Sequence, residues 1–177
     1  MATLTPSFVS LVGLMGTGKS SVAHALAARW PGYVAVDLDE MVIALTGRPI
    51  GDIFRHDGEA AFRALEARCL DVVLAEDLPI ILATGGGAPC QPGVMDKLLA
   101  AGLVVWLDAP PSVLVARALT ADRPLLAGRS PAEAEAFLSA QLLARRPFYA
   151  RATHTVDAAR PLAAVVQAID DAVHLRS

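Results

Sequence analysis

The sequence reads Gly13-Leu14-Met15-Gly16-Thr17-Gly18-Lys19-Ser20 directly after a short apolar run that begins at Phe8. This octapeptide fits the pattern G-x-x-x-x-G-K-[ST] at every fixed position. Its glycines let backbone N–H groups turn inward toward phosphate oxygens, and the positive end of a following helix faces the same anion. Lys19 supplies a charge for the β- and γ-phosphates, and the Ser20 hydroxyl can bind Mg²⁺. The stretch therefore predicts a strand, a phosphate-binding loop and a helix, in that order.

Short apolar runs alternate with longer amphipathic stretches along the rest of the chain. The expected strands cover residues 8–13, 34–37, 80–83, 103–107 and 153–156. The expected helices cover residues 19–29, 39–46, 50–57, 59–76, 92–101, 112–119, 131–146 and a last stretch from 161, with residues 120–129 irregular. Capping-box spacing at Ser130–Glu133 begins the helix at 131, and Pro147 should end it. This alternation predicts an α/β fold of three layers, with a central five-stranded parallel sheet flanked by helices.

Composition excludes several classes of protein. The 177 residues fit a single domain, 1–177, and 54% hydrophobic against 19% charged residues excludes a disordered chain. No run of about 18 uncharged apolar residues is present, so we expect no membrane partner. A net charge of −3 argues against a nucleic-acid partner, and two cysteines make neither a disulfide framework nor a metal site. We expect a cytoplasmic protein with reduced thiols.

Two further motifs follow strands directly, as the phosphate-binding loop does. They are Asp37-Leu38-Asp39 and the glycine triplet Gly85-Gly86-Gly87. Ligands of such sheets bind beyond the carboxyl ends of the strands, so all three motifs should gather at one edge. If strand geometry continued, both carboxylates would face one side, where one could hold a Mg²⁺-bound water and the other take a hydroxyl proton. The alternative is that one of them only caps the next helix.

The glycine triplet also admits two interpretations. Consecutive glycines lose much conformational entropy on folding. They are therefore expected where the backbone must approach another chain or a ligand closely. The triplet is then either a tight turn or a floor of backbone N–H groups beneath a substrate.

Three arginine settings are candidates for anion binding. Arg63 stands three residues before Glu66, either as an exposed ion pair or held by Glu66 toward a substrate carboxylate. Arg123 lies in the irregular segment, where it is either solvated or part of a closing lid. Arg145 and Arg146 end a helix, where cations also complement the helix dipole. The residues alone leave these alternatives open.

A phosphate-binding loop by itself does not select one class of enzyme. The chain contains no asparagine, so it cannot carry the Asn-Lys-x-Asp element with which common GTPases recognise guanine. Motor ATPases are usually larger than this chain. A small nucleotide or metabolite kinase fits best.

Taken together, these motifs resemble the shikimate kinase family in seven places and in one order. The matching segments are 13–20, Asp37-Leu38-Asp39, 46–50 with Ile53-Phe54, 59–63 with Glu66, 84–87, 123–126 and 145–149. The resemblance implies a P-loop kinase fold like that of nucleoside monophosphate kinases, a substrate-binding region at about 38–65 and a mobile lid at about 119–131. It implies a monomer that transfers the γ-phosphoryl group of MgATP to the 3-hydroxyl of shikimate, in chorismate and aromatic amino-acid biosynthesis.

The resemblance also implies roles for individual residues. The catalytic residues would be Lys19, Asp39 and Arg123. The substrate-binding residues would be Asp39, Phe54, Phe62, Arg63, Gly85, Gly86 and Arg145. The ATP-binding residues would be Gly16, Thr17, Gly18, Lys19, Ser20, Ser21, Arg117, Arg123 and Arg160. Ser20, and Asp37 through water, would hold Mg²⁺.

Within that scheme Asp39 would orient or deprotonate the 3-hydroxyl, and Arg63 and Arg145 would hold the carboxylate. The spacing of the family's RxPxY motif selects Arg145 rather than its neighbour Arg146. A kinase for another hydroxy acid, such as gluconate, should lack these paired arginines. A non-catalytic nucleotide sensor should have lost Asp39, Lys19 or Arg123, and all three are present.

Overall fold

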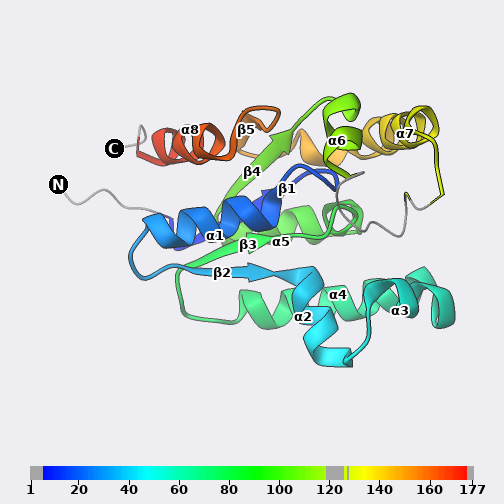
Figure 1. Ribbon diagram of the computed structural model, residues 1–177. Coiled ribbons are helices and arrows are strands. Elements are labelled where there is room, and N and C mark those ends of the chain that lie inside the picture. Colours follow the sequence, from blue (N-terminus) through cyan, green and yellow to red (C-terminus); the bar gives the residue numbers. More distant parts are fainter. Residues whose placement is uncertain (1–5, 119–125, 127, 175–177) are drawn as a thin grey trace.

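The computed structural model describes residues 6–118, 126 and 128–174 and is built on one parallel sheet (Figure 1). Its strands are β1 (Phe8–Val12), β2 (Val34–Asp37), β3 (Ile80–Ala83), β4 (Leu103–Asp108) and β5 (His154–Asp157). They lie in the order β2-β3-β1-β4-β5, and every neighbouring pair is parallel. The three inner strands are buried almost throughout, which explains why their sequences are continuous apolar runs.

Helices cover both faces and one edge of the sheet. They are α1 (Lys19–Arg29), α2 (Leu38–Thr46), α3 (Ile50–His56), α4 (Gly58–Leu74), α5 (Val94–Ala101), α6 (Pro111–Ala118), α7 (Pro131–Tyr149) and α8 (Leu162–His174), with a 3-10 turn η1 at Ala88–Cys90. Figure 1 shows α1 in front of the sheet, α5 behind it, and α2 to α4 together beyond β2. The predicted three-layer α/β fold with five parallel strands is confirmed.

Strand register brings the predicted motifs to one edge. Ala83, the last residue of β3, is level with Leu11 on one side and with Asp37 on the other. The phosphate-binding loop, Asp37 and the glycine triplet therefore all begin at the same carboxyl edge, as the sequence predicts.

Most helix boundaries differ from the sequence prediction by no more than two residues, and two of the differences have a structural reason. Helix α7 does not stop before Pro147 but continues to Tyr149. Proline in a last turn loses one helical hydrogen bond. The buried Tyr149 side chain, whose hydroxyl donates to the Gly86 carbonyl, stabilises the turn nonetheless. Helix α5 begins at Val94 instead of Pro92, because Gly93, with φ 75°, takes the left-handed conformation in front of it.

The described part of the chain, residues 6–118, 126 and 128–174, contains no helix long and apolar enough to cross a membrane.

Candidate functional site

The phosphate-binding loop is closed around the side chain of Lys19. Its ammonium donates to the carbonyl oxygens of Gly13 at 2.9 Å and Leu14 at 2.8 Å, and the side chain is buried. Gly18 has φ 87° and directly precedes α1, a conformation that glycine adopts at little cost. A Cβ on Gly13 would lie 2.5 Å from the Leu107 carbonyl oxygen, so β4 leaves room only for glycine there. These contacts and glycine positions define the shape of the loop.

Asp37 caps helix α2 and also contacts the phosphate-binding loop. Its Oδ1 accepts hydrogen bonds from the N–H groups of Asp39 and Glu40 and so caps α2. Its Oδ2 accepts a hydrogen bond from the Ser20 hydroxyl at 2.5 Å. A hydroxyl and a carboxylate beside a phosphate-binding loop are oxygen ligands of the kind that Mg²⁺ prefers, so these residues fit that ion.

Asp39 does not continue strand β2, which corrects the expectation that both carboxylates share one side of a strand. The cap at Asp37 ends the strand, and Asp39 lies in the first turn of α2. The helix still directs Asp39 to the sheet edge. Its Oδ1 lies 3.1 Å from where a Cβ on Gly85 would be.

The glycine triplet is crowded by charged side chains of the same chain. A Cβ on Gly85 would lie 2.2 Å from Oε1 of Glu66, and one on Gly87 would lie 2.3 Å from Nη2 of Arg63. These distances are shorter than any van der Waals contact, so a side chain at either position would displace the Glu66 carboxylate or the Arg63 guanidinium. The groups that approach the triplet backbone are a carboxylate and a guanidinium of the same chain, and the floor beneath a substrate stays a prediction.

Glu66 and Arg63 form a largely buried pair. Oε2 of Glu66 accepts a hydrogen bond from Nη1 of Arg63 at 2.7 Å, and Arg63 also donates to the more exposed Glu59. Burial raises the pKa of Glu66 by more than the Arg63 charge lowers it. Burial alone would lower the pKa of Arg63, but Glu66 and Glu59 reverse this and raise it. The pair is therefore not the exposed surface pair that the sequence allowed.

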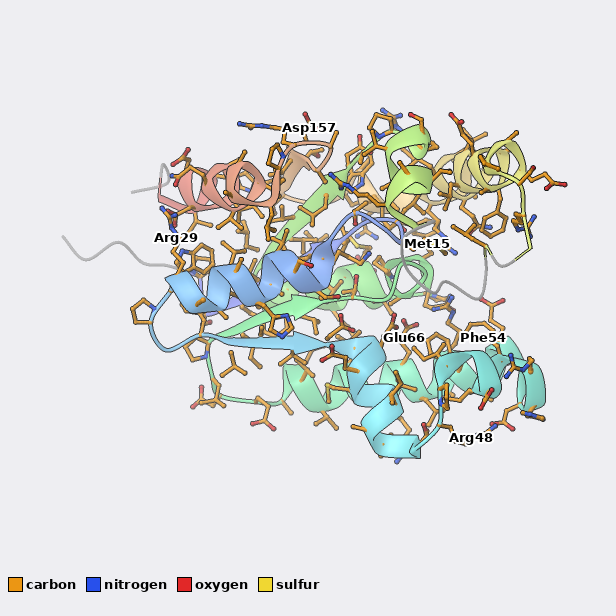
Figure 2. The ribbon with its side chains drawn as sticks, in the orientation of Figure 1. Met15, Arg29, Arg48, Phe54, Glu66 and Asp157 are labelled. Carbon is orange, nitrogen blue, oxygen red and sulfur yellow. The ribbon has the colours of Figure 1, made fainter. Side chains whose placement is uncertain are left out.

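Phe54 and Phe62 lie beside this pair. Their ring centroids are 4.7 Å apart, and the Arg63 guanidinium lies 5.1 Å from the Phe62 ring centroid. In Figure 2, Phe54 and Glu66 appear between helices α3 and α4 and the loop that carries Met15. The two rings form an apolar surface next to the charged groups.

The consecutive arginines Arg145 and Arg146 reach different places. Nη1 of Arg145 lies 3.2 Å from where a Cβ on Gly86 would be. The Arg146 guanidinium lies 5.9 Å from the Trp106 ring centroid and lines a separate groove of about 380 Å³ together with Asp108 and Asp157. Burial raises the pKa of Asp108, and the Arg146 charge partly opposes this. Arg145 is therefore the arginine that joins the glycine triplet.

The remaining predicted residues lie on α1, on α6 and in the loop after β5, or outside the described residues. Arg117, in α6, donates to the carbonyl oxygens of Ala158 at 2.7 Å and Ala159 at 3.2 Å. It thereby contacts the loop after β5, in which Arg160 is exposed. Ser21 is exposed on α1, next to Ser20. Arg123 lies outside the described residues.

One residue at the site received no role from sequence reasoning. Tyr149 is fully buried, and its hydroxyl donates a hydrogen bond to the Gly86 carbonyl oxygen. The available signal was its spacing, because a residue four positions after Arg145 lies on the same face of a helix.

Comparisons with known proteins agree on one family. A family model described as shikimate kinase matches residues 15–174. A curated shikimate kinase of Symbiobacterium thermophilum is 44% identical over 149 residues, covering 82% of this chain and 83% of the relative. Another, from Paramagnetospirillum magneticum, is 42% identical over 150 residues, covering 84% and 74%.

Solved structures give the same result. A shikimate kinase from Bacteroides thetaiotaomicron superposes with a TM-score of 0.89 at 31% identity, covering 94% of this chain and 97% of that one. A shikimate kinase from Acinetobacter baumannii, solved in complex with shikimate, gives a TM-score of 0.89 at 31% identity, covering 99% and 96%.

Proposed function

This chain belongs to the shikimate kinase family, and we propose that it transfers the γ-phosphoryl group of ATP to the 3-hydroxyl of shikimate. The products are shikimate 3-phosphate and ADP, in the biosynthesis of chorismate and the aromatic amino acids. One observation carries the proposal most directly. Asp39, Arg145 and the Glu66-bound Arg63 converge on the glycine triplet, at the edge of the sheet where the phosphate-binding loop begins.

The nucleotide is assigned to the loop at residues 16–21. Its N–H groups and the start of α1 would bind the phosphates, and Lys19 would neutralise charge as it develops on the transferred group. The Ser20 hydroxyl would hold Mg²⁺ directly and Asp37 through water. When bound, Mg²⁺ supplies positive charge to the β- and γ-phosphate oxygens. Arg117 and Arg160 are assigned to the adenine, and Arg123 to the γ-phosphate.

The acceptor is assigned to the glycine triplet. Arg63 and Arg145 would bind its carboxylate, because guanidinium forks match a planar anion with two oxygens. Phe54 and Phe62 would pack on its ring, and the N–H groups of Gly85 and Gly86 would donate to its polar atoms. Asp39 would accept the proton of the 3-hydroxyl as that oxygen attacks phosphorus, and the bond from phosphorus to the β–γ bridging oxygen would break.

We also propose that the protein acts as a monomer in the cytoplasm. The charged groups that crowd the glycine triplet all come from one chain, so the proposed site needs no second copy. The cysteines Cys69 and Cys90 are both free thiols, which suits a reducing compartment.

The experiment is a coupled assay of ADP release with MgATP, run first with shikimate and then with gluconate. We expect ADP release that depends on shikimate, is not stimulated by gluconate, and yields one phosphorylated product. A folded protein that binds ATP but is not stimulated by shikimate would contradict the proposal. Stimulation by gluconate in its place would assign the site to another hydroxy acid.

A further inference from the structure

Tyr149, the last residue of α7, connects that helix to the glycine triplet. Its side chain is fully buried, and its hydroxyl donates to the Gly86 carbonyl oxygen across 63 positions of sequence. Burial raises the pKa of Tyr149, so the phenol keeps its proton at physiological pH and remains a donor. Its ring contacts Trp106 of β4, with centroids 5.9 Å apart.

The glycine triplet needs such a connection. A side chain at position 85 or 87 would displace Glu66 or Arg63 from its place, whereas glycine accommodates both, and glycine backbones have few steric limits on rotation. A peptide unit between two glycines can therefore reorient unless its carbonyl is held. The Tyr149 hydroxyl holds the carbonyl of the unit between Gly86 and Gly87.

Fixing this carbonyl also fixes the neighbouring donor. The peptide is trans and planar, so the Gly87 N–H points away from the Tyr149 hydroxyl. Within residues 6–118, 126 and 128–174, the N–H groups of Gly86 and Gly87 donate no hydrogen bond. They are left available to a ligand, and Tyr149 sets the direction of the Gly87 N–H.

The same helix face also carries Arg145. Arg145 and Tyr149 are four residues apart, so they lie on adjacent turns of α7, and both reach Gly86. A movement of the last turn of α7 would displace the guanidinium and the glycine backbone together. The two groups proposed to bind the substrate from this side thus share one anchor.

We propose that Tyr149 is a positioning residue, which orients the glycine triplet and Arg145 for an acidic hydroxylated substrate without contacting it. The identity of that substrate as shikimate rests on the proposed function. The proposal predicts that removing one hydroxyl group from a fully buried side chain weakens binding of the acceptor and not of ATP.

The chain provides a matched control, because it contains two tyrosines. Tyr33 also donates its hydroxyl to a backbone carbonyl, that of Pro6 at 2.7 Å, at the start of β1 and away from the glycine triplet. Tyr149→Phe and Tyr33→Phe therefore remove the same atom and the same kind of hydrogen bond.

We expect Tyr149→Phe to raise the KM for shikimate about tenfold, the size of one lost hydrogen bond. The KM for ATP should stay within about twofold, and Tyr33→Phe should leave both constants within about twofold. An unchanged shikimate KM in Tyr149→Phe would overturn the proposal. So would an equal rise in both constants, or the same rise in Tyr33→Phe, because either would indicate a general loss of structure.

A second measurement does not depend on turnover. Relaxation dispersion of ¹⁵N-glycine amides reports reorientation of peptide units on the microsecond-to-millisecond timescale. We expect new exchange broadening at Gly86 and Gly87 in Tyr149→Phe and not in Tyr33→Phe. Unchanged glycine amides would overturn the positioning role. If the wild-type protein did not phosphorylate shikimate, the proposed function would fail while this measurement still tested Tyr149.

Discussion

Oε2 of Glu66 accepts a hydrogen bond from Nη1 of Arg63 at 2.7 Å, while Oε1 of the same carboxylate is buried against Gly85. Oε1 has no hydrogen-bond partner among the described residues. Burial of a carboxylate with one unsatisfied oxygen costs free energy. Burial accordingly raises the pKa of Glu66 despite the guanidinium beside it. Glu66 therefore holds Arg63 in place, but its burial lowers the free energy of unfolding of the protein.

Glu66→Gln tests this relationship through pH. A native-state pKa above the unfolded value, near 4.5, means that the native state binds the proton more tightly. The wild type should therefore lose stability as pH rises from below 4.5 through the raised native pKa, and the glutamine variant should lack this component. Between pH 4 and 7, the free energy of unfolding of the variant should rise relative to that of the wild type as pH rises, and chemical unfolding measures this. We also expect its shikimate KM to be about tenfold higher.

Glu133→Gln is the control of opposite sign. Glu133 is exposed in the capping box of α7, where a hydrogen bond from the Ser130 N–H lowers its pKa. This carboxylate stabilises the native state above its unfolded pKa, and the contribution is lost as pH falls through the lowered native pKa. The free energy of unfolding of Glu133→Gln should therefore fall relative to that of the wild type as pH rises. The same trend in both variants would contradict the assignment to Glu66.

Asp37→Asn separates metal binding from helix capping. Asparagine caps helices about as well as aspartate, so the free energy of unfolding should change by less than about 0.5 kcal/mol. The negative charge beside Ser20 is lost, so the Mg²⁺ concentration for half-maximal activity should rise about tenfold. Titration of activity with Mg²⁺ at fixed ATP measures this. If the Mg²⁺ dependence were unchanged, Asp37 would cap helix α2 but would not take part in Mg²⁺ binding. Asp37→Ala should show both losses.

Much of the fold was predictable because its signals are local. The octapeptide at 13–20 and the apolar runs before Asp37 and Gly85 predicted where each motif begins, and strand register then placed them at one edge. The end of α7 was not predictable from Pro147. Tyr149 stabilises the last turn through a contact with Gly86, which lies 63 residues away in the sequence.

The site was predictable in its residue types but not in its contacts. Sequence spacing put Arg63 and Glu66 on one helix face, yet only the packing of α4 against the glycine triplet shows that the pair is buried. The sequence also could not show that Arg145 reaches the glycine triplet while Arg146 lies near Trp106, because that depends on how α7 is rotated against β4. The roles of Lys19, Asp39 and the arginines remain predictions.

Gly87→Ala should damage substrate binding more than folding. The Gly87 backbone has φ −95°, which alanine adopts without strain, but the new Cβ would lie 2.3 Å from Nη2 of Arg63. A flexible guanidinium can move away, so we expect a folded protein with a shikimate KM at least about tenfold higher and an unchanged KM for ATP. Steady-state kinetics with each substrate varied in turn would measure this.

Gly102→Ala is the contrasting variant. A Cβ there would lie 2.2 Å from the backbone carbonyl oxygen of Phe8, which cannot move without disturbing β1. It should cost about 1–3 kcal/mol of unfolding free energy and leave ligand affinity unchanged in the folded fraction. If Gly87→Ala also lost stability on that scale while binding shikimate normally, Arg63 would not be the group that Gly87 accommodates.

Asp39→Asn should abolish most turnover while ATP still binds. A carboxylate that accepts the proton of the attacking hydroxyl typically contributes about 10²- to 10⁴-fold to the rate. The neighbouring Glu40→Gln, in the same first turn of α2, removes a carboxylate that is exposed and should change turnover less than about twofold. Steady-state rates and ATP affinity would be measured for both. Normal turnover in Asp39→Asn would remove Asp39 from the mechanism.

Arg145→Met and Arg146→Met should separate two adjacent residues of one type. Nη1 of Arg145 lies close to Gly86, whereas Arg146 is exposed near Trp106 and Asp108. Loss of a charged hydrogen bond to the substrate carboxylate costs about 1.5–3 kcal/mol, so Arg145→Met should raise the shikimate KM about 10- to 150-fold. Arg146→Met should leave that KM within about twofold and raise the pKa of Asp108 further, because the Arg146 charge now lowers it. Steady-state kinetics and a carboxylate titration by NMR measure both effects. If the shikimate KM rose in Arg146→Met and not in Arg145→Met, Arg146 would be the carboxylate ligand. Helix α7 would then have to be rotated about its axis, relative to the orientation described, when substrate is bound.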